Sequence, residues 1–366
     1  MKSRPTKRAK KANSVVTLKA VADYVGLTPG TVSAVLNDSA AARSFPQHTK
    51  DRVLAAARKL NYRPNLLARA LRVKRTYTIG VITEEIGDAY GGMVISGIEN
   101  YLRQHGYFFL TVAHRHDTKL LEDYSHLLLQ RGVEGFITVD TSIRQPLPLP
   151  TVAVAGHQRI KGVTNLIVNH RTAARIALEH LTSLGHEEIA LMRGPATSSD
   201  SGDRWKAIVE VCRELGIRIR PEQTIQLAGD KATPELGYPF AKRLLARPGA
   251  YTALFAYNDN CAIAAIRAIH EAGLRVPEDI SVVGFDDIPS AAYCIPALTT
   301  VRQPLREMGE IAARTLLNRI EDDETYLPEI VIEPELVVRQ STARARGQIR
   351  QATGSAVHVY AGENLP

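Results

Sequence analysis

The stretch TLKAVADYVGLTPGTVSAVLND, residues 17–38, contains two short helical patterns joined by a glycine. From Leu18 to Val25 the apolar residues recur at the spacing of one helical face, and Thr17 precedes them as a capping residue. Gly26 permits a tight turn, after which Pro29 stands at the first position of a second helix, where its missing N–H costs nothing. Two short helices joined in this way predict a helix-turn-helix, although a small helical bundle for protein contact has the same pattern.

Positive charge is concentrated around this motif. The whole chain has 46 Lys/Arg and 38 Asp/Glu; residues 1–76 hold 17 and 3 of them, which leaves 29 and 35 in the remainder. A cationic end on a mildly acidic body is what binding to a nucleic-acid backbone requires. A solubilising tail explains the basic residues from Lys2 to Lys11 well, but it explains the basic residues within the helical region less well. The charge therefore favours DNA contact over a protein-binding bundle.

Beyond Thr78 the pattern changes to short β-rich runs that alternate with amphipathic helices. This alternation predicts parallel sheets with right-handed crossovers, and the number of units would fill two adjacent α/β subdomains. After Arg302 the chain is expected to cross back to the first subdomain and to form its last helix over residues 305–320. Strands are expected near residues 78–83, 107–112, 134–139, 151–155, 189–193, 224–227, 252–256 and 280–285.

Several classes of protein lack support in the sequence. No apolar run is long enough to span a membrane, and no apolar region follows the basic N-terminus, so we expect a cytoplasmic protein with no membrane partner. Cys212, Cys261 and Cys294 have no CxxC spacing, which argues against a disulfide framework or a zinc site. A solute-binding receptor of a transporter would share the α/β architecture. Such a receptor requires an export signal and has no basic helical segment at its N-terminus, and the sequence shows the opposite.

Catalytic motifs are also missing: the sequence contains no GxSxG, GxGxxG or HExxH and no phosphate-binding P-loop. The pattern closest to a metal site is His114-Arg115-His116-Asp117, at the end of an expected strand, but its arginine opposes cation binding. We therefore expect no enzyme activity, no catalytic or metal-binding residue and no cofactor. A sugar-processing α/β enzyme is the alternative, which a turnover screen with sugars would test.

Residues 17–38 resemble the first two helices of the LacI/GalR family of bacterial transcription regulators, most closely in the run TVSAVLN, residues 31–37. The resemblance covers roughly residues 15–340. It implies a helix-turn-helix and a hinge helix, followed by a core like that of type I periplasmic binding proteins, made of two Rossmann-like subdomains. The matching stretches are TKDRVLAAARKLNYRPNLLARALR (49–72), TIGVI (78–82), LGHEEIALMRGP (184–195), NDNCAIAAIRAIHEAGLRVPEDISVVGFDD (258–287) and LTTVRQP (298–304).

The resemblance also implies a domain organisation and a function. The function is that of a sequence-specific transcription regulator, expected to be a repressor, which binds a near-palindromic DNA operator as a homodimer. Its operator affinity would be controlled by a small effector, a sugar or related metabolite, bound between the two core subdomains. The expected parts are a basic tail (1–14), a DNA-binding domain (15–63), a hinge helix (64–75), a core (76–341) and a C-terminal tail (342–366). Subdomain one would comprise about 76–175 and 303–330, and subdomain two about 176–302 and 331–341.

In this family the residues that open the second helix read bases, as does one residue about a turn later. The corresponding Pro29, Gly30 and Ala34 have no side chain that can hydrogen-bond a base, and the nearby polar side chains suit phosphates better. We therefore expect major-groove readout to be weak and to rely on apolar contact and DNA shape. The predicted major-groove contacts are Thr28, Pro29, Gly30, Thr31, Ser33, Ala34 and Asn37.

The resemblance places a second DNA contact in the hinge, which would fold on DNA and pair with its dimer mate in the minor groove. Leu71 stands where the family inserts an apolar wedge between base pairs, a step that kinks the duplex. The predicted hinge contacts are Asn65, Ala68, Arg69, Leu71 and Arg72.

Polar side chains cluster after the expected strands, where open α/β sheets bind ligands. The resemblance assigns effector contact to Arg204, to the asparagine of an Asn-Asp pair and to a GFDD motif, although capping of the next helix explains Asp287 equally well. Where the family commonly has a carboxylate after the strand at 151–155, this chain has His157. The guanidinium of an arginine donates two parallel hydrogen bonds and an aspartate accepts bonds from two hydroxyls, so together they suit a sugar or polyol. The predicted effector contacts are Arg204, Asn258, Asp286, Asp287, His157 and His114.

Overall fold

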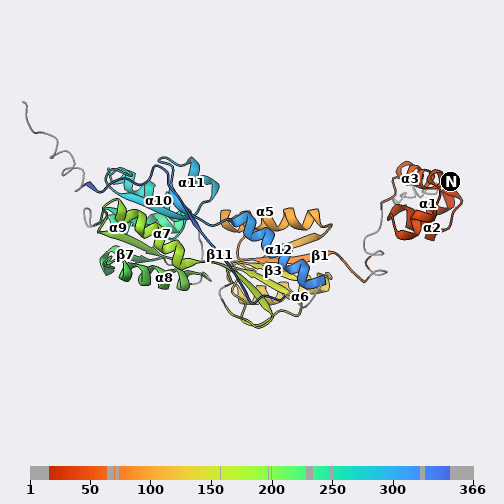
Figure 1. Ribbon diagram of the computed structural model, residues 1–366, viewed down its shortest axis with the longest axis horizontal. Coiled ribbons are helices and arrows are strands. Elements are labelled where there is room, and N and C mark those ends of the chain that lie inside the picture. Colours follow the sequence, from red (N-terminus) through yellow and green to blue (C-terminus); the bar gives the residue numbers. More distant parts are fainter. Residues whose placement is uncertain are drawn as a thin grey trace, which may run out of the picture. The chain divides into compact units, whose positions relative to one another are not determined.

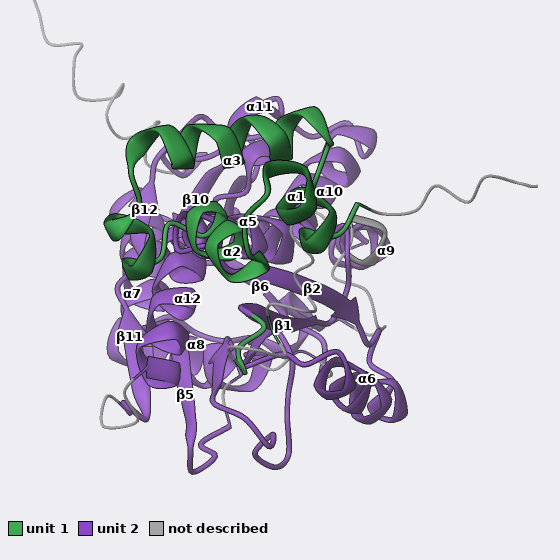
Figure 2. Cartoon of the chain, turned by 90° about the vertical axis from the view of Figure 1, so that its right-hand side faces the viewer, with its two compact units in different colours: residues 1–76 green, residues 77–366 purple. Residues whose placement is uncertain are grey.

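The computed structural model describes residues 16–63, 70, 74–156, 158–196, 198, 200–227, 234–246, 251–321 and 326–346. The chain divides into two compact units, residues 1–76 and residues 77–366, coloured green and purple in Figure 2. The predicted effector contact His157 lies outside the described residues, as do the predicted hinge contacts Asn65, Ala68, Arg69, Leu71 and Arg72.

Unit 1 contains the predicted helix-turn-helix, formed by α1 (Leu18–Val25) and α2 (Pro29–Leu36), together with the single turn η1 (Ala40–Ser44) and α3 (Gln47–Lys59). The hydroxyls of Thr17 and Thr28 accept the N–H groups of Ala20 and Thr31, each at 3.2 Å. The predicted cap Thr17 is therefore confirmed, and Thr28 caps α2 in the same way. Gly26 ends α1 with a φ of 67°, in the left-handed region. The helices enclose a small core of Val21, Ala22, Val25, Val32, Val35, Val53, Ala56 and Ala57.

The first sheet of unit 2, sheet A, is entirely parallel and runs in the order β11-β5-β4-β3-β1-β2 among the described residues. Alternate residues face opposite sides: Ile79 and Val81 of β1 pack against α5 and α12, whereas Ile82 packs against α6. We refer to sheet A and these helices as subdomain one. Its elements are β1 (Thr78–Thr83), α5 (Ala89–Gln104), β2 (Phe108–Ala113), α6 (Thr118–Gln130), β3 (Phe136–Val139), β4 (Thr151–Val154), β5 (Val163–Val168), α12 (Leu305–Glu321) and β11 (Glu329–Ile332).

The helices α5 and α12 lie side by side on one face of sheet A (Figure 1). They approach so closely that a Cβ atom added to Gly309 would overlap the carbonyl oxygen of Val94, and one added to Gly97 would overlap that of Arg306. Backbone therefore packs against backbone at this crossing, which only glycine permits.

The second sheet, sheet B, runs in the order β12-β10-β9-β8-β6-β7 and is parallel apart from the pairing of β10 with β12. Helices α7 and α8 cover one face and α9 and α10 the other, each above a buried apolar cluster. We refer to this sheet and its helices as subdomain two. Its elements are α7 (His170–Ser183), β6 (Ile189–Arg193), α8 (Ser201–Glu214), η2 (Pro221–Gln223), β7 (Thr224–Gln226), α9 (Pro234–Leu245), β8 (Ala253–Phe255), α10 (Asp259–Glu271), β9 (Ser281–Asp286), α11 (Pro289–Tyr293), β10 (Thr299–Arg302) and β12 (Glu335–Val337).

The chain passes between the two sheets after β5, after β10 and after β11. We call the connecting residues 169, 303–304 and 333–334 the crossovers. The return after Arg302 and the last helix are confirmed, since α12 spans Leu305–Glu321. Residues 342–346 lie in the expected C-terminal tail, but they pack on subdomain two. The N–H of Ala345 donates to the carbonyl of Leu184 at 2.9 Å. In the described part of the chain, no helix combines the length and apolar character needed to cross a bilayer.

Candidate functional site

The exposed face of α2 carries small side chains. Pro29 and Gly30 are exposed and Ala34 is partly exposed, whereas Ser33 is only 7% exposed. The amide of Asn37 donates to the carbonyl of Ser33 at 2.7 Å. The polar groups of α2 thus make contacts within the helix, and what it presents outward is mainly apolar surface.

The hydroxyl pair that opens α2 is also internally engaged. Thr28 Oγ1 lies 3.0 Å from Thr31 Oγ1 and already accepts the Thr31 N–H. Both residues remain at the solvent-facing start of the helix, where helix N–H groups and hydroxyls suit a phosphate.

A cavity of about 330 Å³ opens at the carboxyl ends of β1 and β3 in unit 2. Most of its described lining comes from subdomain one, but Asn260, in the first turn of α10, belongs to subdomain two. The cavity is therefore a cleft between the two subdomains, at the place where parallel α/β sheets bind ligands. The polar side chains that line it are Thr83, Glu84, Glu85, Asp88, Tyr90, Asp140 and Asn260.

Arg204, in the first turn of α8, is held in a buried cluster of subdomain two. Its side chain is 6% exposed, and its guanidinium lies 3.8 Å from the ring centre of Phe285. Nη1 donates to the carbonyl of Tyr257 at 2.7 Å, and Nη2 pairs with the carboxylate of Asp200. The Asp200 carboxylate also accepts the Tyr257 hydroxyl at 3.1 Å. Arg204 is thereby fixed in orientation by stacking and by hydrogen bonds.

Two further predicted effector contacts follow strands of sheet B. Asn258 caps α10, since its Oδ1 accepts the N–H of Cys261 at 2.9 Å. Asp286, at the end of β9, is buried and accepts a hydrogen bond from the Gln303 amide at 2.7 Å. This bond connects the end of β9 to the crossover at residues 303–304. Burial raises the pKa of Asp286 well above its usual range, although Arg204 opposes this.

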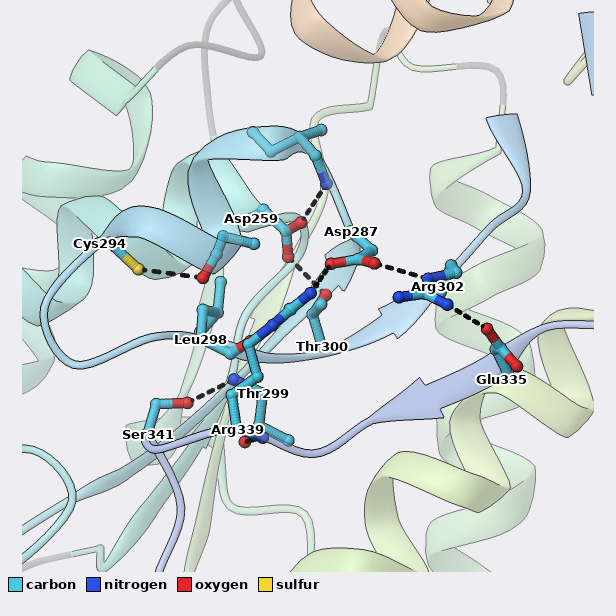
Figure 3. Close-up of polar contacts among 12 residues, drawn as sticks. Asp259, Asp287, Cys294, Leu298, Thr299, Thr300, Arg302, Glu335, Arg339 and Ser341 are labelled. Carbon is cyan, nitrogen blue, oxygen red and sulfur yellow. Dashed lines mark hydrogen bonds and ion pairs between the residues drawn. The ribbon is translucent and has the colours of Figure 1, made fainter. Parts of the chain in front are cut away.

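Asp287 takes part in an ion-pair network beside the crossovers (Figure 3). Its carboxylate accepts Arg302 Nε at 2.6 Å and Arg339 Nη2 at 2.7 Å, and Arg302 also pairs with Glu335 at 2.5 Å. The neighbouring buried Asp259 accepts the Thr300 hydroxyl at 2.5 Å, which ties α10 to β10. Asp287, which follows β9, is thus bound to β10 and to the segment after β12.

The cleft is strongly acidic. The pKa of Glu84 is raised to about 9, first by burial and then by repulsion from Asp140, Asp88, Glu85 and Asp200. The pKa of Tyr90 is raised well above its usual range by burial and by the same kind of repulsion, from Asp140, Asp200 and Asp286. The Nε2 atom of His116 lies 2.8 Å from the carboxyl group of Glu84. Burial is the largest cause of both shifts, and the neighbouring carboxyl groups add to it.

His114 lies beside the cleft and is 6% exposed, with its Nε2 3.1 Å from the Thr141 hydroxyl. Burial and the neighbouring His116 lower its pKa from 6.5 to about 4. An unfolded chain therefore binds a proton at this ring below pH 6.5, whereas the folded chain does not until about pH 4.

We expect the free energy of unfolding to fall by at most about 3 kcal/mol through His114 as the pH drops from 6.5 to 4, because one pKa unit corresponds to about 1.4 kcal/mol. The His114→Gln variant should lose this part of the pH dependence in urea titrations. Over the same pH range Glu84 changes the free energy of unfolding in the opposite direction, but it does so equally in His114→Gln and in the unsubstituted protein. His126→Gln, an exposed control on α6, should follow the unsubstituted protein; equal slopes for all three proteins would contradict the assignment.

The prediction of effector contacts named mainly residues that follow strands of subdomain two and missed the residues of subdomain one that line the cavity. Glu84, Glu85 and Asp88 directly follow β1, so the rule that ligands bind beyond the strand ends was sufficient to find them. Asp140, which directly follows β3, lines the cleft as well. None of the predicted effector contacts that the structure describes lines the described part of the cavity; these are Arg204, Asn258, Asp286, Asp287 and His114.

Comparisons with known proteins find similarity over most of the chain. Residues 17–65 match the family model described as bacterial regulatory proteins, lacI family, and residues 178–342 match the periplasmic binding protein-like domain. The chain is 31% identical over 339 residues to the HTH-type transcriptional repressor PurR of Haemophilus influenzae, covering 89% of this chain and 98% of that protein.

Two solved structures are also similar. A lac repressor dimer bound to operator and an anti-inducer has a TM-score of 0.79 at 28% identity, covering 90% of this chain and 99% of that one. A LacI family regulator from Enterococcus faecium with bound ribose has a TM-score of 0.65 at 28% identity, covering 74% and 100%.

Proposed function

The chain belongs to the lacI family of bacterial regulatory proteins, and on this basis we propose that it represses transcription under the control of a small effector bound in the cleft between its core subdomains. The observation that carries the proposal is the cavity of about 330 Å³, lined from both subdomains, in a chain whose cationic end contains a helix-turn-helix. We propose a sugar or related metabolite as the effector, a class supported by the relative that binds ribose.

The proposed DNA contacts are those predicted from the sequence. Two helix-turn-helix units of a homodimer would lie on a near-palindromic operator, with α2 in the major groove. The largely apolar face of α2 supports readout by apolar contact and DNA shape, with the hinge leucine contributing a wedge in the minor groove. The lac repressor structure, a dimer on its operator, supports this arrangement.

We propose that the effector acts through the crossovers. A ligand in the cleft would touch groups from both subdomains. In subdomain two, Asp286 accepts a hydrogen bond from the amide of the crossover residue Gln303. A ligand that binds the closed cleft better than the open one shifts the population of the two states, and with it the affinity for DNA. Arg204 and Asn258 are proposed as the contacts from subdomain two.

The Leu71→Ala variant should bind its operator about tenfold to a hundredfold more weakly, whereas its binding to non-specific DNA should be nearly unchanged. The reason is that loss of the wedge removes the contacts that a kinked duplex provides but leaves the phosphate contacts intact. The operator would first be selected from genomic fragments with the full chain, and affinities then measured by fluorescence anisotropy.

Leu127→Ala, an exposed leucine on α6, is the matched control and should leave both affinities unchanged. An equal loss on operator and on non-specific DNA would remove the wedge role from Leu71. A failure of the unsubstituted chain to retain any fragment in a salt-sensitive, sequence-dependent manner would contradict the proposed function itself.

A further inference from the structure

The helix proposed to enter the major groove and the segments on both sides of it contain very little positive charge. Between Lys19 and Lys50 the sequence has a single lysine or arginine, Arg43, which lies in the turn η1 directly after α2. Helix α2 itself has no charged side chain. Cationic side chains supply most of the affinity of a protein for the phosphate backbone of DNA, so Arg43 is the residue of this segment that can provide it.

The backbone of η1 is held in place beside α2. The N–H and the hydroxyl of Ser39 both donate to the carbonyl of Ala34, at 3.1 and 3.4 Å, so η1 begins next to the last turn of α2. Ala42 is 1% exposed, and its N–H donates to the carbonyl of Ser39 at 2.7 Å. The N–H of Phe45 donates to the carbonyl of Ala42 at 3.2 Å. These bonds fix the chain on both sides of Arg43.

The side chain of Arg43 differs from other cations of unit 1 in what it contacts. Arg43 is exposed, and within the described part of the chain its side chain makes no hydrogen bond or ion pair. On α3, by contrast, Arg52 Nη2 donates to the carbonyl of Val25 at 2.8 Å, and Lys59 Nζ lies 5.5 Å from the ring centre of Tyr24. Those two cations contribute to packing within unit 1, whereas the donors of Arg43 face solvent.

We propose that Arg43 binds a phosphate group of the operator and thereby holds α2 against the duplex. This inference rests on the proposed function, because it assigns a contact to the same DNA-binding unit. A guanidinium donates two parallel hydrogen bonds to a phosphate, and the charge strengthens both. Phosphates are present at every step of a duplex, so this contact contributes affinity without reading the base sequence.

The test is the salt dependence of DNA binding by the full chain with the substitution Arg43→Gln. Each phosphate contact contributes about 0.9 to the slope of log affinity against log salt concentration, so the loss of one contact per subunit of the dimer should reduce the slope by about 1.8. At about 0.15 M salt this amounts to about 30-fold weaker binding. The loss should be equal on operator and on non-specific DNA, whereas the loss expected for Leu71→Ala is confined to the operator.

Two further variants are the controls for this measurement. Arg43→Lys keeps the charge, and since lysine also binds phosphate it should bind both kinds of DNA within about threefold of the unsubstituted chain. Arg131→Gln removes an exposed arginine of unit 2 and should leave the salt slope unchanged. Circular dichroism would verify that the variants fold, and Arg43→Ala replaces Arg43→Gln if the latter does not.

The inference is overturned if Arg43→Gln leaves the salt slope and both affinities unchanged. It is also overturned if Arg43→Gln and Arg43→Lys both weaken binding to the operator alone, because Arg43 would then read a base. Either result leaves the proposed function intact as long as the unsubstituted chain selects an operator from genomic fragments. An unsubstituted chain that retains no fragment would contradict the proposed function and this contact together.

Discussion

The Gly309→Ala variant should lose about 3 kcal/mol or more of unfolding free energy, a large part of the stability of a typical domain. The new Cβ atom would overlap the carbonyl oxygen of Val94 and lie 2.9 Å from the Ile98 nitrogen, and both are backbone atoms of α5. Backbone atoms inside a helix cannot rotate away as a side chain can. Helices α5 and α12 would have to separate, which would open the apolar cluster beneath them.

Gly92→Ala provides the control for this prediction. Gly92 lies in the same helix α5, but a Cβ atom there meets nothing within 4 Å. Alanine is the better helix former, so this variant should be as stable as the unsubstituted protein or more stable by up to about 1 kcal/mol. Urea unfolding followed by circular dichroism measures both. If Gly309→Ala unfolds at the same urea concentration as Gly92→Ala, the backbones of α5 and α12 are not in contact at Gly309.

The second large effect is expected for Arg204→Met, which should lower the unfolding free energy by about 3–5 kcal/mol and abolish the response to effector. Removing one member of a buried ion pair leaves the other charge without its partner, here the carboxylate of Asp200. Stacking of the guanidinium on Phe285 and Tyr257 is lost as well. Unfolding and effector titrations on the same protein separate the effects on stability and on binding.

A double-mutant cycle shows whether the ion pair is the cause. Adding Asp200→Asn to Arg204→Met should restore part of the lost stability, since no carboxylate is then left buried without a cation. Arg267→Met, which removes an exposed pair with Glu271, should cost less than about 1 kcal/mol. If Arg204→Met is as mild as Arg267→Met, or if the effects of Arg204→Met and Asp200→Asn are additive, the buried pair does not stabilise this part of subdomain two.

The helix-turn-helix could be predicted from sequence because its signals are local. The caps Thr17 and Thr28 and the turn residue Gly26 act within a few residues, so the sequence pattern contains nearly the whole explanation. Strand β5 was missed because Thr164 and Asn165, both buried, interrupt its apolar run. Strands β10, β11 and β12 are short, and their pairing depends on crossovers between the subdomains.

The candidate site could be predicted only in part, for a related reason. That Arg204 and Asp286 lie near one another follows from their positions after parallel strands. The burial of His114 depends on Thr141, 27 residues away, and the two arginines that hold Asp287 come from β10 and from the segment after β12. Local patterns do not contain such long-range contacts.

The central claim is that the cleft and the DNA-binding end are coupled, and the most direct test is a reciprocal titration of the full chain. Operator affinity would be measured with and without saturating ligand, and ligand affinity with and without operator. We expect both ratios to differ from one and to be equal, at about fivefold to 150-fold, since coupling between two binding sites is reciprocal. A ligand that binds the cleft with the same affinity in the presence and absence of operator, and leaves operator affinity unchanged, would contradict the account.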